Sequence, residues 1–464
     1  MTYNFQNTYT KLSSKLFQEV SSPSLTYPKI ILINTKLIQK LGVNYSENPK
    51  QLLESSKPFA QAYAGHQFGY FTNLGDGRAM ILGEHLTPNN KRFDIQLKGS
   101  GRTAYSRGGD GKATISSMIR EYLYSYAMKN LNIKTSETLA VISTNEKVLR
   151  EVIHDGAILI RVMASHIRFG TFEYAAKFCT PDEFQKFTDY TIERHYPDII
   201  YEEKKYVKFF HAVMKKTVDM VVDWYRVGFI HGVMNTDNMS ITGETFDYGP
   251  CAFMNRYDPL TTFSQIDTYK RYCFGKQRDI LKWNLGVLGK TLLPLFDNDI
   301  ELAKKYYKKE LEKFDSYFEK KFYNMMKRKL GIANSKFAKG IINAFLNFLE
   351  INNADYTNTF IELMYPNSIN DEIYHKPEFL KLRTELKKVG LSLNLMQKSN
   401  PQRILRNYLV EEALDEYKNS KKLDKIYELI EAVSSPYTKN DKLEKFEKPP
   451  SREFDKRYKT HCNT

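Results

Sequence analysis

The sequence predicts an α+β fold of two lobes, a β-rich N-terminal lobe followed by a mainly helical C-terminal lobe. Three observations predict it. Segments between about residues 60 and 163 are rich in glycine and contain short runs of strand-like character. After about residue 170 the apolar residues recur at helical spacing instead. The 464 residues suffice for two or three compact units, and two packed lobes leave a cleft between them.

We divide the chain where this pattern changes. Residues 1–60 are expected to form an N-terminal extension packed on the lobes, because prolines break this stretch into short elements, at Pro23, Pro28, Pro49 and Pro58. Residues 61–165 are expected to form the β-rich lobe, and residues 166–464 the helical lobe.

The β-rich lobe has four predicted strands and one predicted helix. Strands are expected at 78–83, 92–98, 138–143 and 157–163, and the glycine-rich segment 99–112 is expected to be a loop. A helix is predicted over 114–130, where apolar residues fall at i, i+3, i+4, i+7 and i+8.

The helical lobe has longer periodic patterns, at 182–194, 204–228, 279–295, 300–330, 335–351, 375–390 and 403–432. Residues 304–329 carry ten basic and four acidic residues. An apolar stripe runs through this segment, with the lysines expected on the other face: Tyr306, Phe314, Phe318, Phe322 and Met325.

The composition excludes several classes of protein. The formal charge is +15, from 69 Lys+Arg against 54 Asp+Glu, but the charges are scattered over helix-like segments, so nucleic acid is not the expected partner. Four cysteines without C-x-x-C spacing argue against structural zinc and suit a reducing compartment. No stretch approaches about 18 uninterrupted apolar residues, and the N-terminus has no apolar signal region. We therefore expect a cytoplasmic protein without a membrane span.

The first chemical motif is Gly75-Asp-Gly77-Arg78, just before a predicted strand. Glycines permit a close approach of the backbone to a ligand, and an arginine there is suited to pairing with phosphate. The alternative is an ordinary hairpin turn.

The second motif is Lys98, at the end of a strand that enters the glycine-rich loop. The loop also has the G-x-G-x-x-A pattern of dinucleotide sites, with Glu121 about twenty residues on, but Glu121 lies inside a predicted helix and not after a second strand. We expect instead that Glu121 pairs with Lys98, because a buried ammonium group needs a carboxylate. Protein kinases hold nucleotide phosphates with such a strand-lysine and helix-glutamate pair.

The third motif is His231-Gly-Val-Met-Asn-Thr-Asp237-Asn238, followed by Phe246-Asp247-Tyr-Gly. This layout is typical of a kinase catalytic loop and its D-F-G segment. Asn238 and Asp247 offer the oxygen ligands that Mg²⁺ prefers, and Asp237 is placed to accept a proton from an attacking hydroxyl. An alternative role for Asp237 is to order the loop. Together the motifs predict a protein-kinase-like fold that binds ATP.

At these motifs the chain resembles the selenoprotein O family of divergent kinase-like proteins. The matching segments are Ala62-Tyr-Ala-Gly-His-Gln-Phe-Gly69, Leu74-Gly-Asp-Gly-Arg-Ala79, Gln96-Leu-Lys-Gly-Ser-Gly101, Gly108-Gly-Asp-Gly-Lys112, His231-Gly-Val-Met-Asn-Thr-Asp-Asn-Met-Ser240 and Asp247-Tyr-Gly-Pro250. The resemblance implies a protein adenylyltransferase, which moves AMP from ATP to a Ser, Thr or Tyr hydroxyl of a protein. It also implies a nucleotide bound in the reverse of the usual kinase direction.

The resemblance implies a role for each matched position. The nucleotide would be contacted by Gly75, Gly77, Arg78, Lys98, Asp110, Gly111, Arg161, Arg168 and Asp247. Lys98, Glu121 and Asp237 would be the catalytic set, and Asn238 and Asp247 would hold Mg²⁺ or Mn²⁺. Three arginines suit a buried triphosphate, because guanidinium pairs bidentately with phosphate. Without the resemblance, ordinary surface pairing is the alternative for Arg161 and Arg168.

One position departs from the family. Where some members have a cysteine that forms a disulfide with the C-terminal cysteine, this chain has Phe263, so Cys462 lacks that partner. Cys251 and Cys273 are the remaining candidates, and the redox role of Cys462 stays open.

Three other functions are consistent with the same motifs: UMP transfer from UTP, a conventional protein kinase, and an ATP-binding scaffold without turnover. The expected partners are proteins bearing Ser, Thr or Tyr hydroxyls, and the chain is expected to be a monomer.

Overall fold

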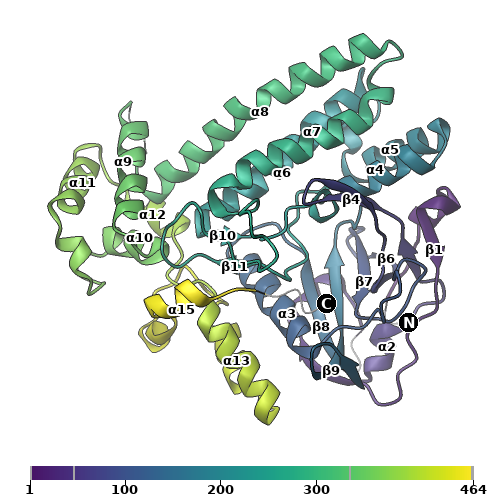
Figure 1. Ribbon diagram of the computed structural model, residues 1–464, viewed down its shortest axis with the longest axis horizontal. Helices are drawn as coiled ribbons and strands as arrows, with labels where there is room; N and C mark the ends of the chain where they lie inside the picture. The colour runs from purple at the N-terminus through teal and green to yellow at the C-terminus, as the bar shows by residue number, and fades with distance from the viewer. Residues whose placement is uncertain (1–2, 45–46, 334–335, 461–464) are drawn as a thin grey trace.

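The computed structural model describes residues 3–44, 47–333 and 336–460. It has a mixed α+β architecture, with the sheet in the N-terminal part and mostly helices in the C-terminal part, consistent with a two-lobed kinase-like fold (Figure 1). The predicted fold class is confirmed. Within the described ranges, no helix combines the length and the apolar character needed to cross a bilayer.

The N-terminal lobe is built on one antiparallel sheet of seven strands, in the order β1-β3-β6-β7-β9-β8-β2. The strands are β1 (Phe17–Glu19), β2 (Lys29–Ile33), β3 (Phe59–Gln61), β6 (Ala79–Leu86), β7 (Arg92–Lys98), β8 (Glu137–Leu149) and β9 (Ile153–Met163). The four predicted strands are the central ones, β6 to β9. Residues 1–60, expected as an extension packed on the lobes, supply both edge strands and the first two residues of β3.

Helix α3 (Ile115–Asn130), predicted over 114–130, covers one face of this sheet. Its N-cap residue is Thr114, whose Oγ1 accepts a hydrogen bond from Ser117 N at 3.3 Å. On the other face a small core includes Ile95 and Leu97 together with residues of α1 (Thr35–Leu41) and α2 (Pro49–Leu53). Because side chains alternate along a strand, Gln96 and Lys98 of β7 point toward α3.

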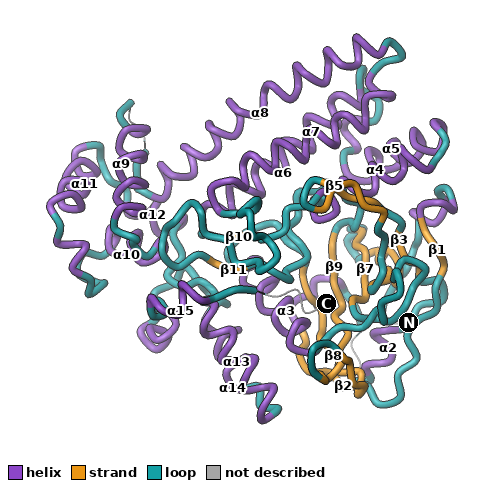
Figure 2. The backbone as a smooth tube through the Cα atoms, in the orientation of Figure 1, coloured by secondary structure: helices purple, strands orange, loops and turns teal. Residues whose placement is uncertain are grey.

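A short hairpin of β4 (Ala64–Gln67) and β5 (Tyr70–Asn73) joins the two lobes. Figure 2 shows it between the sheet and α4 (Phe169–Phe178). His66 N donates to Thr236 Oγ1 at 2.7 Å, and Phe68 N donates to Asn235 Oδ1 at 3.1 Å. The hairpin therefore rests directly on the predicted catalytic loop.

The C-terminal lobe consists of α4 and of α5 (Pro181–His195), α6 (Lys205–Val227), α7 (Gln277–Phe296), α8 (Ile300–Lys329), α9 (Ala338–Ile351), α10 (Tyr356–Met364), α11 (Pro377–Lys388), α12 (Leu393–Ser399), α13 (Asn407–Ser420), α14 (Asp424–Ala432) and α15 (Arg452–Arg457), with the two-stranded pair β10 (Phe229–Ile230) and β11 (Ala252–Phe253). The prediction of one helical segment over 403–432 is wrong. Lys421 adopts φ 60° and ends α13, so the segment forms two helices.

The apolar stripe of α8 is buried as predicted at Phe314 and Phe318, but its lysines do not all face solvent. Lys329 is 2% exposed, its Nζ donates to Arg226 O at 2.6 Å, and the Phe360 ring centroid lies 3.8 Å away. Burial, with Arg226 nearby, lowers the pKa of Lys329 well below its ordinary value.

This burial predicts a pH dependence of stability. Between the lowered folded pKa and the ordinary value of about 10.4, the unfolded chain binds more protons at Lys329 than the folded chain. The free energy of unfolding contributed by this residue therefore rises with pH. In Lys329→Met the slope between pH 8 and 10, measured by urea unfolding, is expected to be smaller than in the unmodified protein. Equal slopes would mean that the amine stays charged when buried.

Candidate functional site

The predicted pair of Lys98 and Glu121 is present at the centre of the molecule. Lys98 ends β7, Glu121 lies on α3, and Lys98 Nζ donates to Glu121 Oε2 at 2.7 Å. The side chains are 5% and 2% exposed. Lys98 Nζ also contacts Asp247 Oδ1, so the strand lysine joins the helix to the segment after the catalytic loop.

Arg161 completes a quartet with these three residues, in which Lys98, Glu121 and Arg161 are buried and Asp247 is partly exposed. Its Nε donates to Glu121 Oε1 at 2.9 Å, and its Nη2 lies 3.3 Å from Asp247 Oδ1. The strand register explains the convergence: β9 pairs with β7 so that Arg161 lies opposite Gln96, whose Oε1 accepts a hydrogen bond from Arg161 Nη1 at 3.2 Å. Arg161 is 3% exposed, so the alternative of surface pairing is wrong for it.

Both carboxylates of the quartet are held in the ionised form. Burial alone would raise the pKa of Glu121, but Arg161 and Lys98 outweigh it, and the pKa lies below its ordinary value. Partial desolvation opposes ionisation of Asp247 as well, yet Lys98, Arg161 and Arg78 hold its pKa well below the usual range. The quartet thus carries two positive and two negative charges, so an added triphosphate needs further positive charge.

Arg78 is placed to provide that charge. It follows the Gly75–Gly77 turn and acts electrostatically on Asp247. Its Nη1 is buried, and no described residue forms a hydrogen bond with it. A partly exposed guanidinium group with one buried, unused donor fits a phosphate oxygen.

The glycines of this turn are required by packing. Gly75 adopts φ +114°, and a Cβ there would lie 2.4 Å from the Tyr105 ring. A Cβ on Gly77 would lie 2.7 Å from Tyr105 O. The turn therefore lies against the glycine-rich loop, and Thr103 Oγ1 donates to Asp76 O at 2.7 Å.

Asp76, between the two glycines, is a buried residue that the sequence interpretation left without a role. Its Oδ2 accepts a hydrogen bond from Gln61 N at 3.0 Å, and its Oδ1 lies 3.9 Å from Arg168 Nη2. Burial raises the pKa of Asp76 to about 6. Its position between the two glycines of the G-D-G motif is the sequence feature that could have indicated a role for Asp76.

Arg168 links this turn to the catalytic loop. Its Nη1 donates to Asp237 O at 3.2 Å, and its guanidinium lies 4.0 Å from the Tyr63 ring centroid and 5.0 Å from that of Phe246. Arg168 is 5% exposed, so surface pairing is wrong here too. These contacts position Asp237 relative to the sheet.

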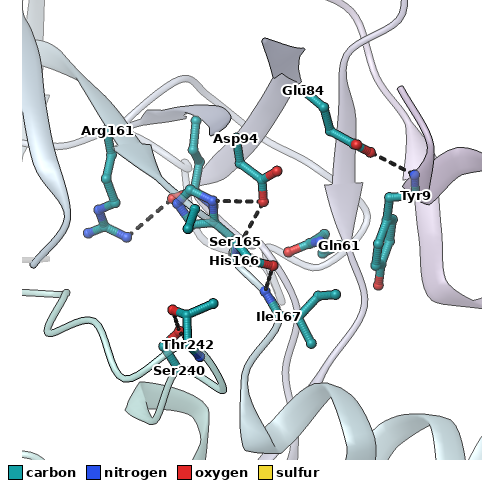
Figure 3. Close-up of polar contacts among 12 residues, drawn as sticks. Tyr9, Gln61, Glu84, Asp94, Arg161, Ser165, His166, Ile167, Ser240 and Thr242 are labelled. Atoms are coloured by element: carbon teal, nitrogen blue, oxygen red, sulfur yellow. Dashed lines mark hydrogen bonds and ion pairs between the residues drawn. The ribbon is translucent and has the colours of Figure 1, made fainter. Parts of the chain in front are cut away.

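The segment that carries Arg168 is itself held by Asp94 (Figure 3). Asp94 Oδ2 accepts a hydrogen bond from His166 N at 2.8 Å. Asp94 Oδ1 accepts one from Arg194 Nη2 at 2.6 Å. Burial lowers the pKa of His166 to about 4, so the imidazole is neutral near pH 7. Asp94 and His166 are positioning residues that no motif indicated.

Asp110 and Gly111 lie in the glycine-rich loop. Arg150 donates to both carboxylate oxygens of Asp110, at 2.8 and 3.1 Å, and this pairing lowers its pKa. Gly111 has φ +68°, and a Cβ there would lie 2.1 Å from Gly101 O. The structure joins Asp110 to Arg150 and does not bring it to the quartet, so its described contacts shape the loop.

The catalytic loop holds Asp237 and Asn238. Asp237 is buried, its Oδ1 has no hydrogen-bond partner among the described residues, and a Cβ on Gly65 would lie 2.3 Å from that oxygen. Burial raises the pKa of Asp237 to about 6. Asn238 Nδ2 donates to Val233 O at 3.0 Å, and its Oδ1 accepts no hydrogen bond from the described part of the chain.

Asn238 and Asp247 offer too few ligands to hold a metal ion by themselves, so a substrate would have to supply the others. Within the described ranges, no group of three or more His, Cys, Asp or Glu side chains is arranged to hold a metal ion. Asn238 Oδ1 and Asp247, 31% exposed at its side chain, are oxygen donors suited to Mg²⁺ or Mn²⁺. Mg²⁺ commonly takes its other ligands from phosphates and water.

Phe263 is 5% exposed, and its ring centroid lies 5.7 Å from that of Tyr458. Thr460 N donates to Phe263 O at 2.8 Å, so the C-terminal segment is bound to this loop by backbone pairing and ring packing. Among the described cysteines, Cys251 and Cys273 form no disulfide with one another or with Cys179. Cys462 lies outside the described residues.

Comparison with known proteins gives a consistent result. Residues 1–434 match the family model described as protein adenylyltransferase SelO. Proteins named protein nucleotidyltransferase YdiU from Clostridium perfringens (strain SM101 / Type A), Alcanivorax borkumensis and Pelagibacter ubique are each 43% identical, and each alignment covers 100% of this chain and 98–99% of the relative. The chain therefore belongs to the SelO/YdiU family of protein nucleotidyltransferases.

Proposed function

We propose that this nucleotidyltransferase moves AMP from ATP to Ser, Thr or Tyr hydroxyls of proteins and releases pyrophosphate. The observation that carries the proposal is the quartet of Lys98, Glu121, Arg161 and Asp247, with the unused Nη1 donor of Arg78 beside it. A kinase holds its phosphates with one lysine and metal ions. A site that adds Arg78 and Arg161 is suited to binding several phosphates of one triphosphate while the α-phosphorus faces the acceptor.

In this proposal each residue has a defined task. Lys98 and Arg161 bind phosphate oxygens while Glu121 orients both cations, and Arg78 adds the positive charge that the neutral quartet lacks. Asn238 and Asp247 would hold Mg²⁺ or Mn²⁺, which neutralises charge on the phosphates when bound. Gly75 and Gly77 allow the close turn that brings in Arg78, and Asp110 and Gly111 shape the loop above the nucleotide.

In the proposed transfer step, AMP moves from ATP to the acceptor hydroxyl and pyrophosphate leaves. The acceptor oxygen forms a bond to the α-phosphorus, the bond from that phosphorus to the pyrophosphate oxygen breaks, and the hydroxyl proton passes to Asp237. Arg168 holds the backbone of Asp237 in place through its hydrogen bond at 3.2 Å.

A base with a pKa of about 6 predicts a pH profile for kcat/KM. Asp237 accepts a proton only when ionised, so kcat/KM is expected to rise through about pH 6 and to level off above pH 7. The profile is measured with α-labelled ATP and a protein acceptor such as casein. The residual activity of Asp237→Asn should lack this rise, and a profile that is flat from pH 5 to 7.5 in the unmodified protein would leave Asp237 with a loop-ordering role only.

The label position in ATP tests the reaction type. With Mg²⁺ and casein, label from α-labelled ATP is expected on protein and label from γ-labelled ATP is not. Retention of the γ-label alone would identify a conventional kinase, and retention of neither label with measurable ATP binding would identify a scaffold. α-Labelled UTP with Mn²⁺, run in parallel, separates UMP transfer from AMP transfer.

A further inference from the structure

A surface with exposed aromatic side chains begins beside the catalytic loop. Phe71 on β5 is 37% exposed and Trp283 on α7 is 38% exposed. The His66 ring lies between them, with centroid distances of 5.7 Å to Phe71 and 5.4 Å to Trp283. These three residues line one cavity of about 730 Å³.

This surface is continuous with Asp237 through the β4–β5 hairpin. Gly65, next to His66, lies against Asp237 Oδ1, and His66 N donates to Thr236 Oγ1 at 2.7 Å. The hairpin also contacts the segment that carries Arg271 and Tyr272, since the Phe68 and Tyr272 ring centroids are 5.1 Å apart. A chain that lies on the aromatic surface would therefore pass next to Asp237.

Unpaired positive charges border the aromatic rings. Arg271 lies 5.0 Å from the Trp283 ring centroid, and Lys177 Nζ lies 4.1 Å from that of Phe71. Lys290 lines the same cavity as Trp283. Across residues 3–44, 47–333 and 336–460, no carboxylate forms an ion pair within 4.0 Å with Arg271, Lys177 or Lys290. Arg271 Nε is in addition buried without a hydrogen-bond partner among those residues.

The two carboxylates that line this cavity, Glu173 and Asp279, each lie near a basic side chain. Glu173 Oε2 lies 2.6 Å from His66 Nδ1, and Asp279 lies 3.6 Å from Arg278. The surface thus combines apolar rings with cations that have no carboxylate partner among the described residues, and a complementary ligand carries carboxylates next to an aromatic or aliphatic side chain.

We infer that this surface binds the acceptor protein through an acidic segment with an aromatic or aliphatic side chain near the modified hydroxyl. We call it the acceptor surface, formed by His66, Phe71, Lys177, Arg271, Trp283 and Lys290. The inference rests on the proposed function, because the hydroxyl is delivered to Asp237. Carboxylates pair with Arg271 and the two lysines, and the apolar side chain packs on Trp283 and Phe71.

Direct binding tests the inference without any transfer reaction. Two fluorescein-labelled peptides of equal length each contain one Ser and one Phe, flanked by Glu in one and by Lys in the other. Fluorescence anisotropy with the full chain is expected to give at least tenfold tighter binding of the Glu peptide, and Arg271→Gln and Trp283→Ala should each weaken it about tenfold. Lys387→Gln on α11, which also removes one exposed charge, should have no effect.

Thermal midpoints of the variants establish that they are folded. Equal binding of the two peptides, or unchanged binding in folded Arg271→Gln, would overturn the inference. Since Trp283 contacts His66, Trp283→Phe is a second variant that keeps an aromatic ring, and it should retain most of the binding.

Transfer measurements separate this inference from the proposed function. With α-labelled ATP, the KM for the Glu peptide is expected to rise in Arg271→Gln while kcat changes little. If neither peptide is labelled but the Glu peptide binds selectively, the proposed function fails and the surface stands. If both peptides are labelled with the same KM, the proposed function stands and the acceptor surface is wrong. If labelling occurs only on this chain itself, the occupant is a second copy, which also overturns the inference.

Discussion

Asp247→Asn is expected to lower the rate of AMP transfer by roughly 10²–10³-fold. The carboxylate contacts both Lys98 and Arg161, and it is the proposed charged ligand of the metal. The amide keeps the size of the side chain but removes its negative charge. The rate is measured under single-turnover conditions with α-labelled ATP and casein.

The same substitution separates transfer from nucleotide binding. Without the Asp247 charge the quartet changes from neutral to a net positive charge, so ATP binding, measured by equilibrium dialysis without metal, is not expected to weaken. Asp182→Asn serves as the control, because it makes the same change in a surface pair in which Asp182 is 74% exposed, and it should leave the rate unchanged. A rate in Asp247→Asn above a tenth of the original would show that the metal is held elsewhere.

Glu121→Gln is expected to lower the free energy of unfolding by about 3 kcal/mol. Two buried cations, Lys98 and Arg161, would lose the carboxylate that both contact and would share Asp247 alone. Removing one member of a buried ion pair leaves an uncompensated charge in a medium of low dielectric constant. Urea unfolding measures the loss.

A surface substitution, Glu412→Gln, and the addition of ATP provide two further measurements for this prediction. Glu412→Gln on α13, 53% exposed beside Lys425, should change the free energy by less than about 0.5 kcal/mol. Saturating ATP should restore part of the stability of Glu121→Gln, because its phosphates supply negative charge near Lys98 and Arg161. A loss no greater than that of the control would mean that water screens the quartet.

The local periodicity of apolar residues predicted most of the longer strands and helices. The central strands β6 to β9 and helix α3 were predicted, because each has enough alternating or helical apolar positions to be recognised alone. The two edge strands, β1 and β2, and the short strand β3 were not predicted. They are three to five residues long, and their pairing partners lie far along the chain, as for Phe17 opposite Gln61.

The sequence indicates a candidate site residue where a charged or amide residue stands in a pattern that is rare outside nucleotide-binding sites. A strand lysine, a helix glutamate and an Asn-Asp set before an aromatic-glycine turn indicated Lys98, Glu121, Asn238 and Asp247 from the sequence. By contrast, the pairing of Asp110 with Arg150 across 40 residues has no local signal. The break at Lys421 was missed because both flanking segments keep the helical period.

By itself, the sequence determined which chemical groups are present and on which elements they lie. Only the tertiary structure decided that Arg161 shares Glu121 with Lys98, that Arg168 supports Asp237, and that the β4–β5 hairpin covers the catalytic loop. The contacts that bring these residues together span 40 to 170 residues. Such contacts depend on strand register and on the packing of the two lobes, which no local pattern records.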